Sequence, residues 1–285
     1  MKRIIRVFPS RTKQTPTDEL AFVGDPQLFR PESDEVHVSV TFTWDKPEAE
    51  RLVDAWGRYY KTVRIGGPAY GDPGGEFVGG RYVKEGVTFT SRGCPNKCKS
   101  CMVPGREGKL RELKTIVPGN TVQDNNLLAC SRDHFERVCD MLEGQRDIQF
   151  SGGFEAARLT DWHVKRLMRL RVGQMFLAYD RPEELKPVLR AIDHLRWAGF
   201  KQRQIRCFVL VGHTLEDTPQ AAENRLSTIF NAGALPYVMF WRDENSKKEI
   251  PQSWKKLVWL WSRPGATMSH GNKLRAEMAK IKGGG

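Results

Sequence analysis

Residues 87–104 read VTFTSRGCPNKCKSCMVP, a short strand pattern that runs directly into a loop rich in cysteine. The loop carries Cys94, Cys98 and Cys101 in the spacing C-x3-C-x2-C. Three thiolates can hold three irons of a cubic 4Fe–4S cluster and leave the fourth iron open for a ligand. A structural zinc site takes four protein ligands. The spacing therefore favours an iron–sulfur site over zinc.

Downstream of this loop, strand patterns alternate with amphipathic helix patterns. The strands are predicted over 121–128, 148–150, 174–178, 205–211 and 235–241, with helices that begin at Ser131 and Thr160 and one that ends at Gly199. Such alternation indicates a parallel sheet covered by helices. The stretch is too short for a complete eight-fold barrel of ~250 residues. We therefore predict an α/β fold with a partial (β/α)6 TIM-like barrel over residues 81–245.

Upstream of the loop, residues 36–44, VHVSVTFTW, alternate between apolar and polar side chains, as a strand with one buried face does. A helix with apolar residues Ala49, Leu52 and Trp56 follows, and then a strand over 63–65. These elements predict a small N-terminal β-α-β unit over residues 1–80, with a further strand at 3–8. Glycines crowd residues 71–86, where we place the boundary. Residues 246–285 are predicted to form a C-terminal helical extension.

The formal net charge of the 285-residue chain is +12, and most of it falls in residues 92–114 and 242–285. This distribution favours an anionic partner such as nucleic acid, although charged side chains also keep a surface soluble. No apolar run reaches the ~18 residues that a membrane span needs. We find no secretory signal, and clustered cysteines suit a reducing compartment. The sequence thus predicts a cytoplasmic protein without membrane contact, and it leaves the oligomeric state open.

The cysteine spacing directly after the first strand of a partial barrel resembles the radical S-adenosylmethionine superfamily. The string TSRGCPNKC, residues 90–98, resembles the subset that includes methylthiotransferases and cobalamin-binding-domain-associated enzymes, and this compact chain is similar to uncharacterised, phage-encoded members. The resemblance covers residues 87–241 and extends weakly to 36–68, which look like half of a Rossmann-like domain. It implies a 4Fe–4S cluster on the three cysteines, S-adenosylmethionine as cofactor, and an electron donor such as flavodoxin or ferredoxin. The implied reaction is reductive cleavage to a 5′-deoxyadenosyl radical that abstracts hydrogen from the substrate.

The resemblance also implies contacts to S-adenosylmethionine at the carboxyl ends of strands, where barrel active sites lie. Many members carry an aromatic residue just before the third cysteine, where this chain has Ser100, and Met102 and Val103 are the candidate replacements for its contact with adenine. Gly152 and Gly153 either form a tight turn or let the backbone approach the cofactor. The other implied residues are Asp124, Asn125 and Asn126 for the methionyl group, Tyr179 and Asp180 for the ribose, and Val209 to Gly212, followed by Glu216, for the adenine.

An alternative from another class is a zinc-stabilised nucleic-acid-binding module without catalysis, in which Cys130 or His134 completes the loop site. Cys139 and Cys207 fall on apolar faces and are predicted to be core residues. Residues 250–262 place Trp254 and other apolar side chains on one helical face, which favours packing, although tryptophans among lysines can also stack bases. We do not expect cobalamin, because Asp34-Glu35-Val36-His37 lacks the Asp-x-His-x-x-Gly spacing. The substrate and the reaction outcome, whether methylation, thiomethylation, epimerisation or rearrangement, stay open.

Overall fold

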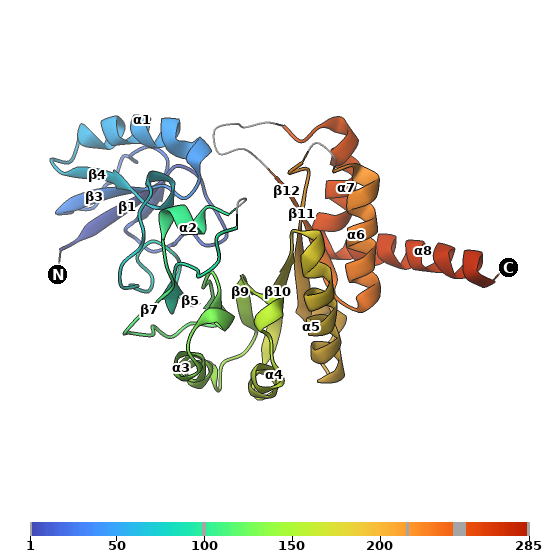
Figure 1. Ribbon diagram of the computed structural model, residues 1–285. Coiled ribbons are helices and arrows are strands. Elements are labelled where there is room, and N and C mark those ends of the chain that lie inside the picture. Colours follow the sequence, from blue (N-terminus) through green and yellow to red (C-terminus); the bar gives the residue numbers. More distant parts are fainter. Residues whose placement is uncertain (1, 99–100, 215–216, 242–248, 284–285) are drawn as a thin grey trace. The chain divides into compact units, whose positions relative to one another are not determined.

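The structure, a computed structural model, describes residues 2–98, 101–214, 217–241 and 249–283. The chain divides into two compact units, the first ending at Asn125 and the second beginning at Asn126 (Figure 1). Our predicted boundary near residue 80 falls inside the first unit. Both units are mixed α/β structures built on parallel strands. Neither sheet closes into a barrel among the described residues, and the partial (β/α)6 barrel stays a prediction.

The first unit is built on a four-stranded parallel sheet in the order β2 (Ala21–Val23), β1 (Ile4–Phe8), β3 (Glu35–Ser39), β4 (Val63–Gly66). Helix α1 (Lys46–Gly57) connects β3 to β4 and buries Ala49, Leu52 and Trp56 in the core. The predicted β-α-β unit is thereby confirmed. Strand β3 ends earlier than predicted, because residues 43–45 form a turn of 3-10 helix and the rings of Phe42 and Trp44 stack 4.6 Å apart. Strand β2 was not predicted.

The rest of the first unit contains short strands around the cysteine loop. Strand β5 (Val87–Thr88) pairs in parallel with β8 (Thr121–Val122), and β6 (Ser91–Arg92) pairs in antiparallel with β7 (Arg111–Glu112). The single-turn helix α2 (Val103–Arg106) lies between β6 and β7 in sequence. The prediction of one strand over 121–128 is wrong beyond Val122, because residues 127–129 form a 3-10 turn.

The second unit contains four parallel strands that are neighbours in chain order: β9 (Ile148–Phe154), β10 (Val172–Tyr179), β11 (Ile205–Val211) and β12 (Leu235–Phe240). The helices are α3 (Arg132–Leu142), α4 (Asp161–Leu167), α5 (Leu185–Trp197) and α6 (Pro219–Ala232). The Ser131 side chain accepts a hydrogen bond from the His134 amide at 3.2 Å, which confirms the predicted cap of α3. Cys139 and Cys207 are buried, as predicted for core residues.

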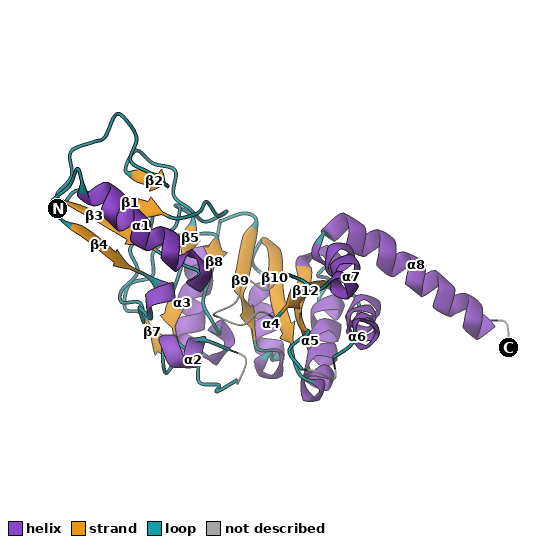
Figure 2. Cartoon of the chain, turned by 90° about the horizontal axis from the view of Figure 1, so that it is seen from above, coloured by secondary structure: helices purple, strands orange, loops and turns teal. Residues whose placement is uncertain are grey.

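The C-terminal helices pack as part of the second unit. Helix α7 (Gln252–Ser262) buries Trp254 and Trp261, so the predicted packing role of its apolar face is confirmed. Helix α8 (Pro264–Gly283) contacts α6 through its first half, where a Cβ atom on Gly271 would lie 2.6 Å from the Phe230 ring. Residues 275–280 are exposed, and Figure 2 shows this end of α8 extending away from α6 and α7.

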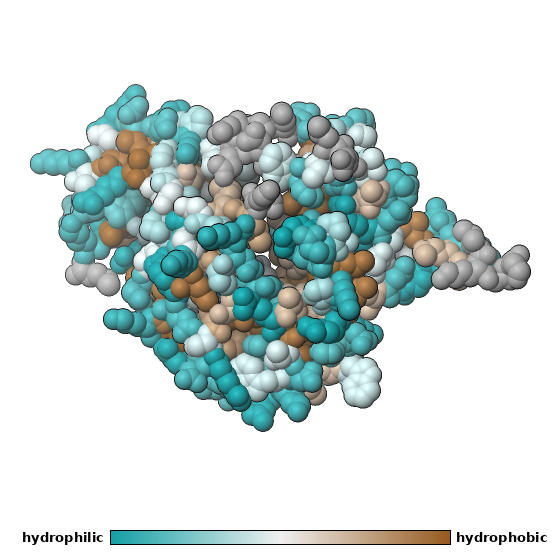
Figure 3. Space-filling view, in the orientation of Figure 1, coloured by the Kyte–Doolittle hydropathy of each residue, from teal (hydrophilic) through white to brown (hydrophobic). Residues whose placement is uncertain are grey.

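The surface is polar over most of the face drawn in Figure 3, with apolar residues in small, separate patches. None of the helices in the described part of the chain combines the length and apolar character that crossing a bilayer requires.

Candidate cofactor-binding loop

The three loop cysteines lie between the paired strands β6 and β7, with residues 99 and 100 outside the described part of the chain. The Cys94 amide donates a hydrogen bond to the Gly108 carbonyl at 3.2 Å, and the Cys101 amide donates to the Cys98 carbonyl at 3.1 Å. Cys94 and Cys98 are half-buried, Cys101 is exposed, and none of the three forms a disulfide. The three cysteines thus share one loop whose ends are held by a β-ladder.

Gly93 fixes how the chain enters this loop. Its φ is +75°, in the left-handed region that side chains rarely adopt, and a Cβ atom there would lie 2.2 Å from the Lys109 carbonyl oxygen. The chain entering the loop and the chain leaving it are thus in direct backbone contact. No residue with a side chain fits at this position without moving one of the two strands.

Glu107 holds the same loop from inside. Its carboxylate accepts hydrogen bonds from the Gly93 amide at 3.0 Å, the Arg106 guanidinium at 2.7 Å and the Asn125 amide at 2.6 Å. Burial raises the pKa of Glu107, but the hydrogen bonds from Gly93 and Arg106 outweigh burial and hold the pKa below its usual value. The ionised Glu107 carboxylate therefore connects the start of the loop at Gly93 to its end and to Asn125. Glu107 was not predicted as a site residue, and the signal that could have identified it is that it is one of only two acids in the basic stretch 92–114.

Asp124 and Asn125 are predicted to bind the methionyl group, and in the structure both contact the chain itself. Asp124 is only 2% exposed, and its carboxylate accepts hydrogen bonds from the Thr90 amide at 2.7 Å, the Ser91 hydroxyl at 2.7 Å and the Thr90 hydroxyl. Asn125 donates to Glu107 as described above. These contacts connect the segment after β8 to the segment that leads into the cysteine loop.

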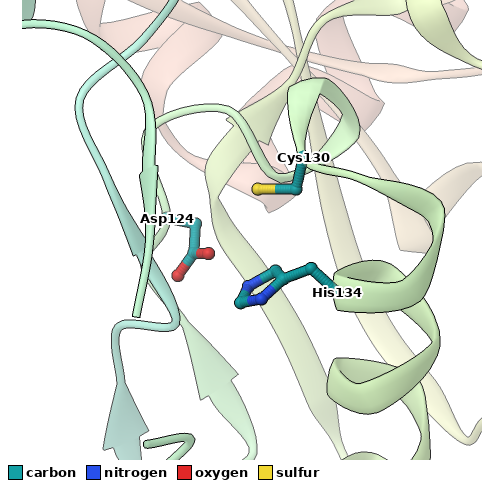
Figure 4. A group of neighbouring side chains, drawn as sticks. All are labelled: Asp124, Cys130 and His134. Atoms are coloured by element: carbon teal, nitrogen blue, oxygen red, sulfur yellow. The ribbon is translucent and has the colours of Figure 1, made fainter. Parts of the chain in front are cut away.

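A group of potential metal ligands lies along the continuous segment 124–134. One ligand atom from each of Asp124, Cys130 and His134 lies within 4.8 Å of the other two (Figure 4). Carboxylate, thiolate and imidazole are all donors that zinc accepts. Cys130 and His134 are the two residues predicted as alternatives for the fourth ligand of a zinc site on the loop. In the structure their ligand atoms lie close to that of Asp124.

The remaining predicted contacts lie at or near the carboxyl ends of strands in the second unit. Asn126 donates to the Glu155 carboxylate at 2.7 Å, and Gly152 and Gly153 lie inside β9 rather than in a turn after it. Tyr179, the last residue of β10, is buried. The Asp180 carboxylate accepts from the Leu210 amide at 3.2 Å, and burial raises the pKa of Asp180.

The predicted adenine contacts have different environments. The Val209 side chain is fully buried in the core, so any contact it makes with a cofactor would be through its backbone. The Gly212 amide, just past β11, donates to the Asp217 carboxylate at 2.7 Å. Met102, next to Cys101 in the sequence, is 42% exposed. Glu216 lies outside the described residues.

In comparisons with known proteins, no family model matches this chain, and no curated protein sequence matches it. A function for this chain is therefore inferred from its own residues and their geometry.

Proposed function

We propose that this protein is a radical S-adenosylmethionine enzyme whose 4Fe–4S cluster is held by Cys94, Cys98 and Cys101. The observation that carries the proposal is the loop itself, which has three cysteines within eight residues, in the spacing C-x3-C-x2-C, and which Gly93 and Glu107 hold in place. When bound, the cluster would supply the electron that cleaves S-adenosylmethionine. The residues that the resemblance assigns to S-adenosylmethionine stay predictions, as do the electron donor and the anionic substrate.

The pKa values of the two buried cysteines, Cys139 and Cys207, support this choice of ligands. Burial raises the pKa of Cys139 to about 12, and burial likewise raises the pKa of Cys207 well above its usual value. A thiol must lose its proton to bind iron or zinc. These two cysteines are therefore poor ligands, and the loop cysteines are the better donor set.

The test is anaerobic reconstitution of the full chain with iron and sulfide, followed by measurement of iron content and of S-adenosylmethionine cleavage under reducing conditions. Cys94→Ala, Cys98→Ala and Cys101→Ala should each lose most of the iron and all of the cleavage. The matched control is Cys139→Ser, which should keep the iron and cost roughly 1–3 kcal/mol of unfolding free energy, because a hydroxyl replaces a buried thiol.

The second candidate is a zinc-stabilised nucleic-acid-binding protein, which the grouping of Asp124, Cys130 and His134 favours. It predicts a colourless protein with one equivalent of zinc that is lost in Cys130→Ala and His134→Ala. A reconstituted protein that keeps its iron in all three loop variants would overturn the iron–sulfur proposal.

A further inference from the structure

A cavity of about 340 Å³ lies within the first unit, at the carboxyl ends of β3 and β4. Val38, Ser39, Ile65 and Gly66 line it from these strands, and the segment 72–92 provides the opposite wall. Ligands of open parallel sheets bind outside the carboxyl ends of the strands. The volume is at the lower end of the ~300–1,000 Å³ range of small-molecule sites, which suits one compact ligand rather than a corrinoid or a dinucleotide.

One wall of this cavity is formed by aromatic and cationic side chains, with the Phe77 and Phe89 rings tilted by 59° to each other. The Phe77 and Phe89 rings lie 5.4 Å apart, and the Arg92 guanidinium lies 4.0 Å above the centre of the Phe89 ring. All three residues line the cavity, as does Tyr82. Flat faces of this kind bind heteroaromatic rings by stacking, largely independent of which ring is bound.

Arg92 also offers hydrogen-bond donors to a ligand. Its Nε atom is buried, and it has no hydrogen-bond partner among the described residues. Gly74 covers it so closely that a Cβ atom there would lie 2.9 Å from Nε. Leaving a buried guanidinium donor without an acceptor is costly. Arg64 and Arg81 line the same cavity, as do the acids Asp72, Glu76 and Glu107. An anionic group of a ligand would therefore have to bind at the arginines and clear of the three carboxylates.

A hydrogen-bond chain ends at the cavity. The Tyr82 hydroxyl lies 2.6 Å from His37 Nδ1, and His37 Nε2 lies 3.0 Å from the Glu35 carboxylate. Hydrogen bonds from Lys2 and His37 lower the pKa of Glu35 to about 2, so the carboxylate is ionised and can only accept. His37 Nε2 therefore carries the proton, and Nδ1 accepts from the Tyr82 hydroxyl. The lone pairs of the Tyr82 oxygen are then left to accept from a ligand donor.

From these features we infer that the cavity binds a mononucleotide. The base packs against the rings of Phe77 and Phe89, Arg81 and Arg92 bind the phosphate, and the Tyr82 oxygen accepts from the base or the ribose. The inference rests on the first unit alone and holds whether or not the loop carries a cluster. A terminal nucleotide of a single strand presents the same chemistry as a free nucleotide, so the experiment includes both.

The experiment is isothermal titration calorimetry of the full chain, iron-free and reconstituted, with AMP, GMP, CMP and UMP. The four corresponding nucleosides serve as probes without phosphate, and ribose 5-phosphate and inorganic phosphate serve as probes without base. A short single-stranded oligonucleotide tests whether the terminal nucleotide of a strand binds. At least one mononucleotide should bind at least tenfold more tightly than its nucleoside and than ribose 5-phosphate. The same affinity should be measured with and without iron, which separates this result from the outcome for the radical chemistry.

Variants locate the binding within the cavity. Arg92→Gln should weaken nucleotide binding at least tenfold. Arg132→Gln is the matched control, since Arg132 also stacks on an aromatic ring, 4.6 Å above Trp162 in the second unit, and should leave binding unchanged. If Arg92→Gln fails to fold, Arg81→Gln and Tyr82→Phe test the same cavity by the same tenfold criterion. Absence of nucleotide binding, equal binding of inorganic phosphate, or equal losses in Arg92→Gln and Arg132→Gln would overturn the inference.

Discussion

Gly93 occupies the tightest position in the candidate cofactor loop, and its replacement has a clear expected cost. Gly93→Ala should lower the unfolding free energy by about 2–4 kcal/mol, because the new Cβ atom meets the Lys109 carbonyl at 2.2 Å and the backbone is in the left-handed region. Urea unfolding measures the loss. The control is Gly105→Ala on the same loop, where nothing lies within 4 Å of the new Cβ atom and stability should change little. Equal stability of the two variants would contradict this account.

Asp124 is a second single-residue case, and here the structure redirects our expectation from cofactor binding to folding. Asp124→Asn should cost roughly 1–3 kcal/mol of unfolding free energy, because an amide nitrogen would face the donors of Thr90 and Ser91. Asp193→Asn, at an exposed position of α5, should be nearly neutral. Weaker S-adenosylmethionine binding in a fully stable Asp124→Asn protein would restore the cofactor role.

The candidate site could be predicted from the sequence only where spacing along the chain determines it. The spacing of Cys94, Cys98 and Cys101 is local, so the sequence alone groups them on one loop. Glu107 and Asp124 act through residues 14 to 34 positions away, and no local pattern reports such contacts. The sequence around Asp124 also does not indicate whether its carboxylate binds a ligand or the backbone amide of Thr90.

Among the elements, α3 and α4 are joined by one arginine. Arg166 on α4 is 7% exposed in its side chain and pairs with Glu136 at 2.6 Å and Asp140 on α3 and with Glu143, the residue after α3, at 2.8 Å. Arg166→Gln should cost about 2–4 kcal/mol of unfolding free energy, since it leaves three carboxylates together without their cation. Glu143→Gln should cost less than about 1 kcal/mol, because the other two acids still pair with the arginine. Urea unfolding that gave similar losses for both would refute the joint role of Arg166.

We expect the unfolding free energy to depend on pH through Glu35, which lies on β3 beside β1. Hydrogen bonds from Lys2 and His37 lower the pKa of Glu35 to about 2 from the model-compound value of 4.5, so its ionised form stabilises the folded state. This contribution is complete above pH 4.5 and is lost as the pH falls toward 2. The stability advantage of the natural protein over Glu35→Gln, measured by urea unfolding, should therefore shrink between pH 6 and about pH 3. A constant difference over that range would show that Glu35 is not the titrating group.

Long elements with regular periodicity were predictable, and short ones were not. The strand at 205–211 and the helices capped by Ser131 and Thr160 follow the sequence pattern closely. By contrast, β5 to β8 have two residues each, and their pairing depends on distant partners. The predicted strand over 121–128 fails for this reason, because tertiary hydrogen bonds to Asp124 outweigh the local preference for an extended chain.

At the scale of the whole molecule, the net charge of +12 raises the question of a polyanionic partner. Of the basic residues in α8, Arg275 is used for folding, since it donates to Asn231 and to the Phe230 carbonyl. Lys273 and Lys280 are exposed and are the better candidates for phosphate contacts. We predict that single-stranded DNA binding depends on salt and that Lys273→Gln with Lys280→Gln reduces the slope of log Kobs against log salt by about 1.4.

The control for this prediction removes the same number of charges from the same unit. Lys186→Gln with Lys201→Gln, both exposed, should leave the slope unchanged. Fluorescence anisotropy across a range of salt concentrations measures both slopes. Equal effects of the two pairs would assign binding to net charge rather than to α8.

The contrast between the two halves of α8 has a consequence for amide hydrogen exchange. The part of α8 up to Arg275 packs on α6: Thr267 is buried, His270 Nε2 lies 2.6 Å from the Glu223 carboxylate, and Arg275 donates to Asn231 and to the Phe230 carbonyl. Residues 276–280 are exposed, with the Met278 sulfur 4.0 Å from the Asn231 side-chain nitrogen. A helix end of that length without packed side chains is marginal in water and opens by fraying rather than by unfolding of the unit. Protection factors along α8 should therefore fall steeply after Arg275, while the amides before it exchange together with those of α6. One continuous helix would then belong to two exchange regimes, one set by the stability of the second unit and the other by local helix–coil equilibrium.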